Sequence, residues 1–179
     1  WHVAGNAISR SGCLPAVHAR NLFLMATHLK AGDPAPDFSA LATDGSTINL
    51  ADFRGKKLVM YFYPMDDTPG CTKQACSLRD ASAEITARGA AILGVSAQGE
   101  ASHQRFTEKF QLNFPLLADS DLAIAKAYGV AGSGLGGLLR SLVKVSERVT
   151  FVIDEQGRVA HVISDPNCPD HGEEVLGLL

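Results

Sequence analysis

The residues best suited to chemistry in this sequence are its cysteines, and Cys71 occupies the most favourable place for a nucleophile. The stretch 64–72 joins an apolar run to a segment with the pattern of a helix. Thr68 is a favourable N-cap, and Pro69 suits the first helical position because its missing N–H is not needed there. Cys71 then falls in the first turn, where unpaired N–H groups and the helix dipole favour an anion. A thiolate is such an anion and is the nucleophilic form of cysteine.

Cys76 follows five residues later, and helical geometry keeps the two cysteines apart. Five residues advance roughly 7.5 Å along the axis and about 140° around it, so the Cα atoms lie roughly 8–9 Å apart. A disulfide requires Cα atoms within about 7 Å. Cys71 and Cys76 therefore cannot bond while the helix is intact. From spacing alone, a small buried hydrophobic residue is an equally good interpretation of Cys71.

Length and composition limit the class of protein. The chain has 179 residues, 46% of them hydrophobic, and a formal net charge of −3. This length suits one domain with a substantial core. The near-neutral charge argues against a nucleic-acid-binding protein, and no apolar run reaches the roughly 18 residues of a membrane span. The 4 cysteines are too few for a disulfide scaffold, which favours a chemical role for some of them.

The elements that must position Cys71 alternate between strands and helices. The expected elements, by residue number, are a hairpin at 38–50, a buried central strand at 58–63, a helix at 69–88, a strand at 90–95, a helix at 100–110, an edge strand at 114–118, a helix at 121–128, a hairpin at 148–164 and a terminal helix at 169–179. This order predicts an α/β fold with a mixed central sheet flanked by helices and an N-terminal β-hairpin. The layout matches a thioredoxin-like fold, although layout alone allows others.

Local signals mark several boundaries. Asp44-Gly45 predicts the first hairpin turn, and Gly89 and Gly129 are expected to end helices in the left-handed conformation. Ser120 is the candidate N-cap of the helix at 121–128. The glycine-rich stretch 131–146 lacks the Gly-Lys-Ser/Thr ending of a phosphate-binding loop and is expected to be a flexible connection.

The first 29 residues differ from the rest. The first acidic residue is Asp33, and residues 1–29 show no clear period. We expect them to be an N-terminal extension that is expression-derived, upstream-translated or a remnant of a targeting peptide, with Met25 as a plausible start. The domain proper is expected over 30–179.

Three residues around the first cysteine carry a resemblance to a known family. Pro64, Thr68 and Cys71 fill the fixed positions of Pro-x-x-x-Thr-x-x-Cys, and the sequence resembles the peroxiredoxins. Residues 62–64 and 68–72 are similar to the bacterioferritin comigratory protein, or Q-type, branch. The resemblance runs from about residue 30 to the C-terminus.

The resemblance implies roles for the residues of this motif. Cys71 would be the peroxidatic cysteine, which attacks the O–O bond and becomes a sulfenic acid. Thr68 would orient thiolate and peroxide, and Pro64 would shield the site from water. The backbone N–H groups of Gly70 and Cys71 would hold peroxide oxygens. Arg148 matches the family's distant arginine beside the thiolate; otherwise it is a surface charge at a strand end.

The second cysteine of the helix would then be the resolving one. In the Q-type branch a cysteine at the spacing of Cys76 commonly has this role, which requires the first helical turns to unwind after oxidation. Otherwise Cys76 is a buried thiol and another group resolves the sulfenate. Cys13 and Cys168 match no family site.

The implied activity is that of a thiol-dependent peroxidase in antioxidant defence. It would reduce hydrogen peroxide and organic hydroperoxides and be recycled by thioredoxin or glutaredoxin, without a cofactor, metal, nucleic acid or membrane. A monomer in the cytoplasm is expected, or in an organelle if residues 1–29 are a targeting remnant. A protein dithiol–disulfide oxidoreductase is disfavoured because Cys-x-x-Cys is absent, and a redox-regulated holdase is the third possibility.

Other polar residues are expected to have no chemical role. His103 shares no spacing with the other histidines and is expected at the surface, and Asp66-Asp67 is expected to be a solvated turn. Cys168 and His171, with His161 nearby, form too small a set to predict a metal site.

Overall fold

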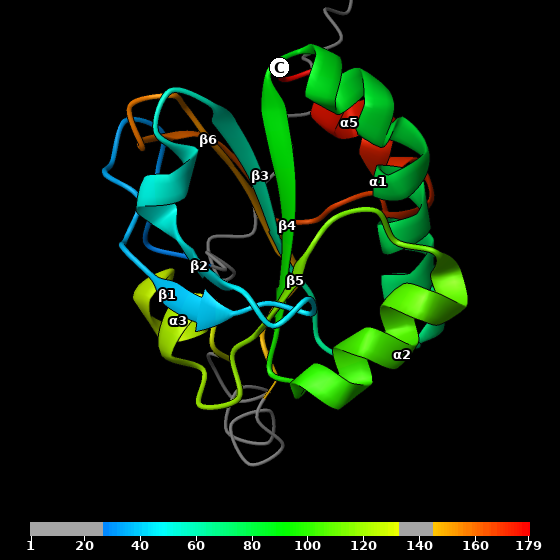
Figure 1. Ribbon diagram of the computed structural model, residues 1–179. Coiled ribbons are helices and arrows are strands. Elements are labelled where there is room, and N and C mark those ends of the chain that lie inside the picture. The colour runs from blue at the N-terminus through cyan, green and yellow to red at the C-terminus, as the bar shows by residue number, and fades with distance from the viewer. Residues whose placement is uncertain (1–26, 133–144) are drawn as a thin grey trace, which may run out of the picture.

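The computed structural model describes residues 27–132 and 145–179, which form a five-stranded mixed sheet with helices on both faces (Figure 1). The strands are β1 Ser39–Leu41, β2 Thr47–Asn49, β3 Lys57–Phe62, β4 Ala90–Ser96, β5 Leu116–Ala118, β6 Val149–Ile153 and β7 Val159–Ile163. The helices are α1 Pro69–Ala87, α2 Glu100–Phe110, α3 Ala123–Ala127 and α5 His171–Leu176, with 3-10 turns η1 Leu50–Phe53 and η2 Cys168–Asp170. The predicted thioredoxin-like layout, including the separate β1–β2 hairpin, is confirmed.

The central strand β3 determines where the site lies. The sheet order is β5-β4-β3-β6-β7, with β3 parallel to β4 and antiparallel to β6. In this register Phe62 pairs with Val149. The end of β3, which leads into α1, therefore lies beside the residue that precedes β6, which is Arg148.

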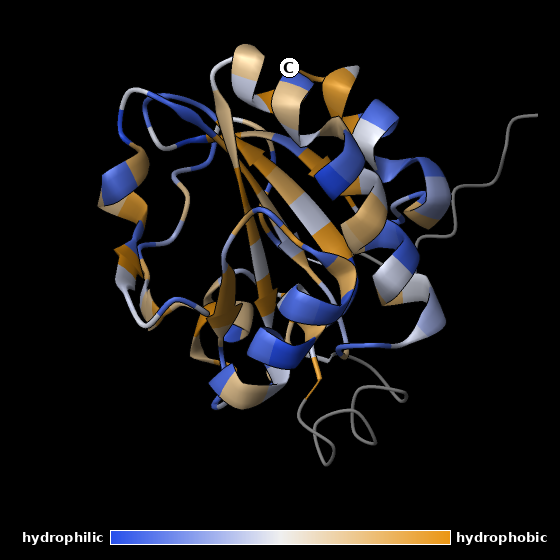
Figure 2. Cartoon of the chain, turned by 45° about the vertical axis from the view of Figure 1, so that its right-hand side comes forward, coloured by the Kyte–Doolittle hydropathy of each residue, from blue (hydrophilic) through white to orange (hydrophobic). Residues whose placement is uncertain are grey.

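Alternate residues of β3 point to two separate cores. Leu58, Met60 and Phe62 face the core covered by α3 and the β1–β2 hairpin. Val59 and Tyr61 face the core beneath α1, α2 and α5. All are buried, which explains the continuous apolar run in the sequence. Figure 2 shows apolar residues concentrated on the inner strands and hydrophilic residues on the outer surface of α2.

Most predicted boundaries are confirmed, but one helix begins differently. Gly89 and Gly129 have the expected positive φ, at 76° and 69°. The N-cap prediction for Ser120 is wrong, because α3 begins after Leu122. The carboxylate of Asp119 accepts hydrogen bonds from the N–H groups of Ile124 and Ala125, at 3.0 and 2.8 Å, and thereby caps the helix from a buried position.

The predictions for the N-terminal segment and the glycine-rich connection fall largely outside the described residues. Residues 1–26 and 133–144 lie outside the described residues, as does most of the predicted glycine-rich connection. Thr27 is buried, and its hydroxyl donates to the carbonyl of Tyr128 at 2.5 Å. The domain boundary at residue 30 stays a prediction. In the described part of the chain, no helix combines the length and apolarity needed to cross a membrane.

Candidate active site

Cys71 lies in the first turn of α1, as the sequence predicts. Thr68 is the N-cap with extended backbone (φ −88°, ψ 150°), and Pro69 opens the helix. The N–H of Thr72 donates to the carbonyl of Thr68 at 2.8 Å. The N–H groups of Gly70 and Cys71 precede this bond at the positive end of the helix dipole. The thiol itself is only 1% exposed.

Arg148 brings a positive charge to this sulfur from the residue that precedes β6, the strand next to β3. Its Nη2 donates to Cys71 Sγ at 3.2 Å, and its Nη1 donates to Gln74 Oε1 at 2.5 Å. The guanidinium also lies close to the backbone of α1, because a Cβ at Gly70 would be 3.3 Å from Nη2. A hydrogen bond from a guanidinium to an anionic sulfur is charge-assisted and therefore stronger than one between neutral groups.

Gln74 is a site residue that the sequence analysis missed. Its side chain is fully buried, and its Nε2 has no hydrogen-bond partner among the described residues. Residues three apart on a helix share a face, so the spacing from Cys71 to Gln74 is a signal that could have found it. Its contact with Arg148 is not visible in any local pattern.

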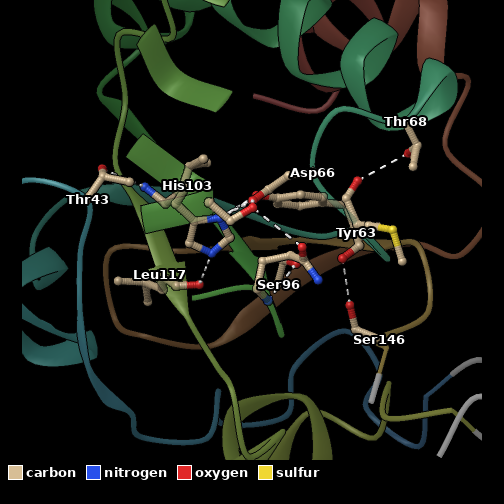
Figure 3. A network of polar contacts seen from close by, with 12 residues as sticks. Thr43, Tyr63, Asp66, Thr68, Ser96, His103, Leu117 and Ser146 are labelled. Carbon is tan, nitrogen blue, oxygen red and sulfur yellow. Dashed lines mark hydrogen bonds and ion pairs between the residues drawn. The ribbon is translucent and has the colours of Figure 1, made fainter. Parts of the chain in front are cut away.

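The other two motif residues, Thr68 and Pro64, lie in the loop before α1, and no hydrogen bond between the described residues joins either side chain to the Cys71 sulfur. The Thr68 hydroxyl donates to the carbonyl of Met65 at 3.1 Å, which closes the loop before α1 (Figure 3). No hydrogen bond joins it to Cys71 within the described part of the chain. Pro64 is half-buried at the start of the same loop. The roles of Thr68 and Pro64 at the sulfur stay predictions.

Cys76 lies in the intact helix α1, apart from Cys71, and both are free thiols. Cys76 is half-buried beside Arg79, whose side chain also donates to the carbonyl of Phe110 at 2.5 Å. Cys168 is a free, half-buried thiol in η2.

A buried polar network anchors the loop that precedes Cys71 (Figure 3). The imidazole Nδ1 of His103 lies 2.9 Å from Asp66 Oδ2, and its Nε2 lies 3.1 Å from the carbonyl of Leu117. Asp66 also accepts from the Tyr63 hydroxyl at 2.7 Å and from Ser102 Oγ at 2.6 Å. Burial raises the pKa of Tyr63, which keeps its phenol protonated as a donor.

The expectation that His103 lies at the surface is wrong, because its side chain is 0% exposed. The expectation of a solvated Asp66-Asp67 turn is wrong for Asp66, whose side chain is 5% exposed, and confirmed for Asp67, whose side chain is 50% exposed. The two buried residues come together because His103 and Phe106 of α2 pack against the ring of Tyr63, three residues before Asp66. Burial opposes ionisation of Asp66, but hydrogen bonds from His103 and Ser102 outweigh it and lower the pKa of the carboxyl.

A second buried histidine, His171 at the start of α5, contacts Thr150, which lies two residues beyond Arg148. His171 Nε2 is 2.9 Å from Thr150 Oγ1, and its Nδ1 is 2.9 Å from Glu174 Oε2. Burial lowers the pKa of His171, and the hydrogen bond to Glu174 opposes this only in part. Within residues 27–132 and 145–179, no group of three His, Cys, Asp or Glu residues is arranged to hold a metal ion.

Comparison with known proteins places this geometry in a family. The chain matches the AhpC/TSA family over residues 31–162. It is 42% identical over 153 residues to Peroxiredoxin Bcp of Escherichia coli strain K12, with 84% of this chain and 96% of that protein covered. It is 36% identical over 167 residues to the chloroplastic Peroxiredoxin Q of Oryza sativa subsp. japonica, with 93% of this chain and 73% of that protein covered.

A solved structure gives the same result. The bacterioferritin comigratory protein of Xanthomonas campestris, studied for alkyl peroxide reduction, superposes with a TM-score of 0.72 at 30% identity. The match covers 84% of this chain and 95% of that one. The chain therefore belongs to the AhpC/TSA family and is a peroxiredoxin of the bacterioferritin comigratory protein and Q-type branch, a thiol peroxidase.

Proposed function

We propose that this protein reduces hydrogen peroxide and organic hydroperoxides through Cys71. The observation that carries the proposal is the Arg148 guanidinium, 3.2 Å from a cysteine sulfur at a helix N-terminus. Alkyl peroxide reduction by the Xanthomonas campestris relative supports the substrate class. The Cys71 thiolate attacks the terminal peroxide oxygen, the O–O bond breaks, and Cys71 becomes a sulfenic acid. The leaving alkoxide takes up the proton that the thiol released and departs as an alcohol, or as water from hydrogen peroxide.

Each neighbouring group has a part in this step. Arg148 stabilises the thiolate and the charge that develops on the leaving oxygen. The N–H groups of Gly70 and Cys71 donate to the peroxide oxygens. Thr68, whose hydroxyl must leave the carbonyl of Met65 to do so, orients the peroxide, and Pro64 limits access of water.

Cys76 then resolves the sulfenic acid. Its thiol attacks the Cys71 sulfur, a disulfide forms, and the hydroxyl leaves as water. The first turns of α1 must unwind for this. From Ser77 onward the helix is held by α5, because the N–H of Gly172 donates to Ser77 Oγ at 2.9 Å. The unwinding is therefore expected to stop near Ser77.

A dithiol reductant of the thioredoxin or glutaredoxin type completes the cycle by reducing the Cys71–Cys76 disulfide. Because both cysteines belong to one chain, no partner thiol is required, and we place the reaction in a monomer. The bacterial and chloroplastic relatives fit a cytoplasmic location or an organellar one.

A thioredoxin-coupled peroxide assay tests this proposal. The wild type should turn over, Cys71→Ser should be inactive, and Cys76→Ser should stop after one oxidation. Cys168→Ser is the matched control and should retain activity. Mass spectrometry of peroxide-treated protein should find a Cys71–Cys76 bond. Turnover that survives Cys71→Ser defeats the proposal. A disulfide between Cys71 and Cys168 would make Cys168, and not Cys76, the resolving residue.

Hydrogen exchange tests the unwinding. Amides of residues 70–76 should exchange faster in the disulfide form than in the reduced form, while the buried positions Leu78 and Ile85 stay protected. Equal exchange in both forms contradicts the model of local unfolding.

A further inference from the structure

The loop that carries the Pro-x-x-x-Thr-x-x-Cys motif is held at its middle by α2. Asp66 is the third residue of this motif, between Pro64 and Thr68. Its carboxylate accepts three hydrogen bonds. One comes from Tyr63, three residues earlier, and two come from Ser102 and His103 in α2. The loop is therefore attached to a neighbouring helix by a buried group, rather than by its own backbone alone.

Both ring nitrogens of His103 have a polar partner. Nδ1 faces the carboxylate of Asp66, and Nε2 faces the carbonyl of Leu117 in β5. The Tyr63 hydroxyl, 3.4 Å from Nδ1, directs its own proton to Asp66, which leaves Nδ1 to donate to the same carboxylate. His103 and Asp66 thus form a buried hydrogen-bonded pair.

The backbone around Asp66 explains what the pair holds. Asp67, the next residue, has φ 56°, a left-handed conformation that a non-glycine side chain adopts at a cost. Its carboxylate pairs with Lys109 at 2.6 Å, but both side chains are about half exposed, with values of 50% and 58%. An exposed pair contributes little. The buried pair one residue earlier is the stronger restraint on this turn.

We propose that the Asp66–His103 pair positions the first turn of α1, so that Cys71 stays beside Arg148 in the reduced enzyme. His103 is a positioning residue, since it acts through the loop and touches neither sulfur nor peroxide. The inference rests on the proposed role of Cys71. It also predicts that the loop stays anchored when α1 unwinds, because the pair lies on the N-terminal side of Cys71.

The test separates the peroxide step from the resolution step. In Asp66→Asn and in His103→Asn, the second-order rate of Cys71 oxidation should fall at least about tenfold, as expected for a displaced reacting group. Disulfide formation from the sulfenic acid, followed separately, should not slow, because it requires departure from the folded site. Asp67→Asn is the matched control from the same turn and should stay within about twofold of wild type, since its ion pair is exposed.

The double variant tests whether the two residues act as one unit. Asp66→Asn combined with His103→Asn should lose no more than the worse single variant, whereas losses that multiply would show two independent effects. Lower stability with an unchanged peroxide rate assigns the pair a structural role only. If peroxide turnover depends on Cys71 and these variants match wild type, this inference fails and the proposed function stands.

A measurement on the unaltered protein keeps the inference open to refutation if the variants do not fold. Nitrogen-15 NMR of the His103 imidazole in the reduced wild type should show a proton on Nδ1, hydrogen-bonded to the Asp66 carboxylate. An Nδ1 without a proton overturns the proposed pair.

Discussion

The Nη2 of Arg148 lies 3.2 Å from Cys71 Sγ, although the two residues are 77 positions apart in the sequence. The antiparallel pairing of β3 and β6 produces this contact, because it sets the residue before β6 beside the loop that leads into α1. The other terminal nitrogen of Arg148 donates to Gln74 Oε1.

Replacing Arg148 by lysine should slow the reaction with peroxide. Lysine keeps the charge but lacks the planar fork whose two separate nitrogens bond Cys71 and Gln74, so it does not reproduce both contacts. Loss of one hydrogen bond to a charged group costs about 1.5–3 kcal/mol, or roughly 10- to 100-fold in the second-order rate. Competition kinetics with a reference peroxidase measures it. Arg158→Lys, a change at an exposed arginine that bonds Gly32, should leave the rate unaltered; an equal rate in Arg148→Lys removes Arg148 from the site.

Gln74 should be needed to hold Arg148 in place. Gln74→Leu leaves Nη1 of Arg148 without its acceptor and should lower the peroxide rate about tenfold. Gln74→Glu keeps an acceptor but adds a negative charge that competes with the thiolate for Arg148, so it should also be slow. The exposed neighbour Lys73 supplies the control, Lys73→Ala, with little change expected. Wild-type rates in both Gln74 variants would mean that Arg148 needs no such support.

Gly70→Ala should separate activity from stability. A Cβ at this position would lie 3.3 Å from Arg148 Nη2, so the guanidinium must move by a few tenths of an ångström. The peroxide rate should fall a few-fold, while alanine in the helix raises stability by up to about 1 kcal/mol. Kinetics and urea unfolding are measured on the same samples. Gly99→Ala, whose Cβ would meet open space, should not change the rate.

The packing of α5 on α1 should be intolerant of a single methyl group. A Cβ at Gly172 would lie 2.5 Å from the carbonyl oxygen of Ser77 and 2.6 Å from Ala81 Cβ. Gly172→Ala should therefore lower the free energy of unfolding by about 1–3 kcal/mol, as overpacking does. Gly177→Ala, with its closest contact at 3.5 Å, is the control and should be neutral within about 0.5 kcal/mol. Equal stabilities in the two variants would mean that α5 shifts freely on α1.

Stability should fall in mild acid because of His171. Burial lowers the pKa of His171 in the folded protein below its unfolded value, so below about pH 6.5 the unfolded chain binds a proton that the folded chain resists. This contribution is constant above that pH, and below it stability declines by at most about 1.4 kcal/mol per pH unit until the folded pKa is reached. Urea unfolding at about pH 8 and about pH 5 should show a smaller acid loss in His171→Gln than in wild type. His161→Gln, at an exposed position, should keep the wild-type slope.

The sequence by itself determined the features that depend on neighbouring residues. Pro69 opens α1 after Thr68 and so places Cys71 in its first turn, because proline geometry acts locally; the Thr68 hydroxyl makes no capping hydrogen bond and donates to Met65 instead. Two other features could also be predicted from a few neighbouring residues. The Asp44-Gly45 turn needs a positive φ, which glycine adopts, and the continuous apolar run of β3 indicates a strand that is buried on both faces. Arg148 was assigned by resemblance to a family, not by any spacing within this chain.

Only the tertiary structure decided the contacts that join distant segments. Asp66 and His103 are 37 positions apart, and nothing in either local pattern distinguishes them from solvated surface residues. Asp119 replaces the expected cap Ser120 because a buried carboxylate reaches two N–H groups of α3. A polar side chain is assigned to water or to a partner by the packing of whole elements, and that packing brings His103 of α2 against Tyr63 and Gln74 against Arg148.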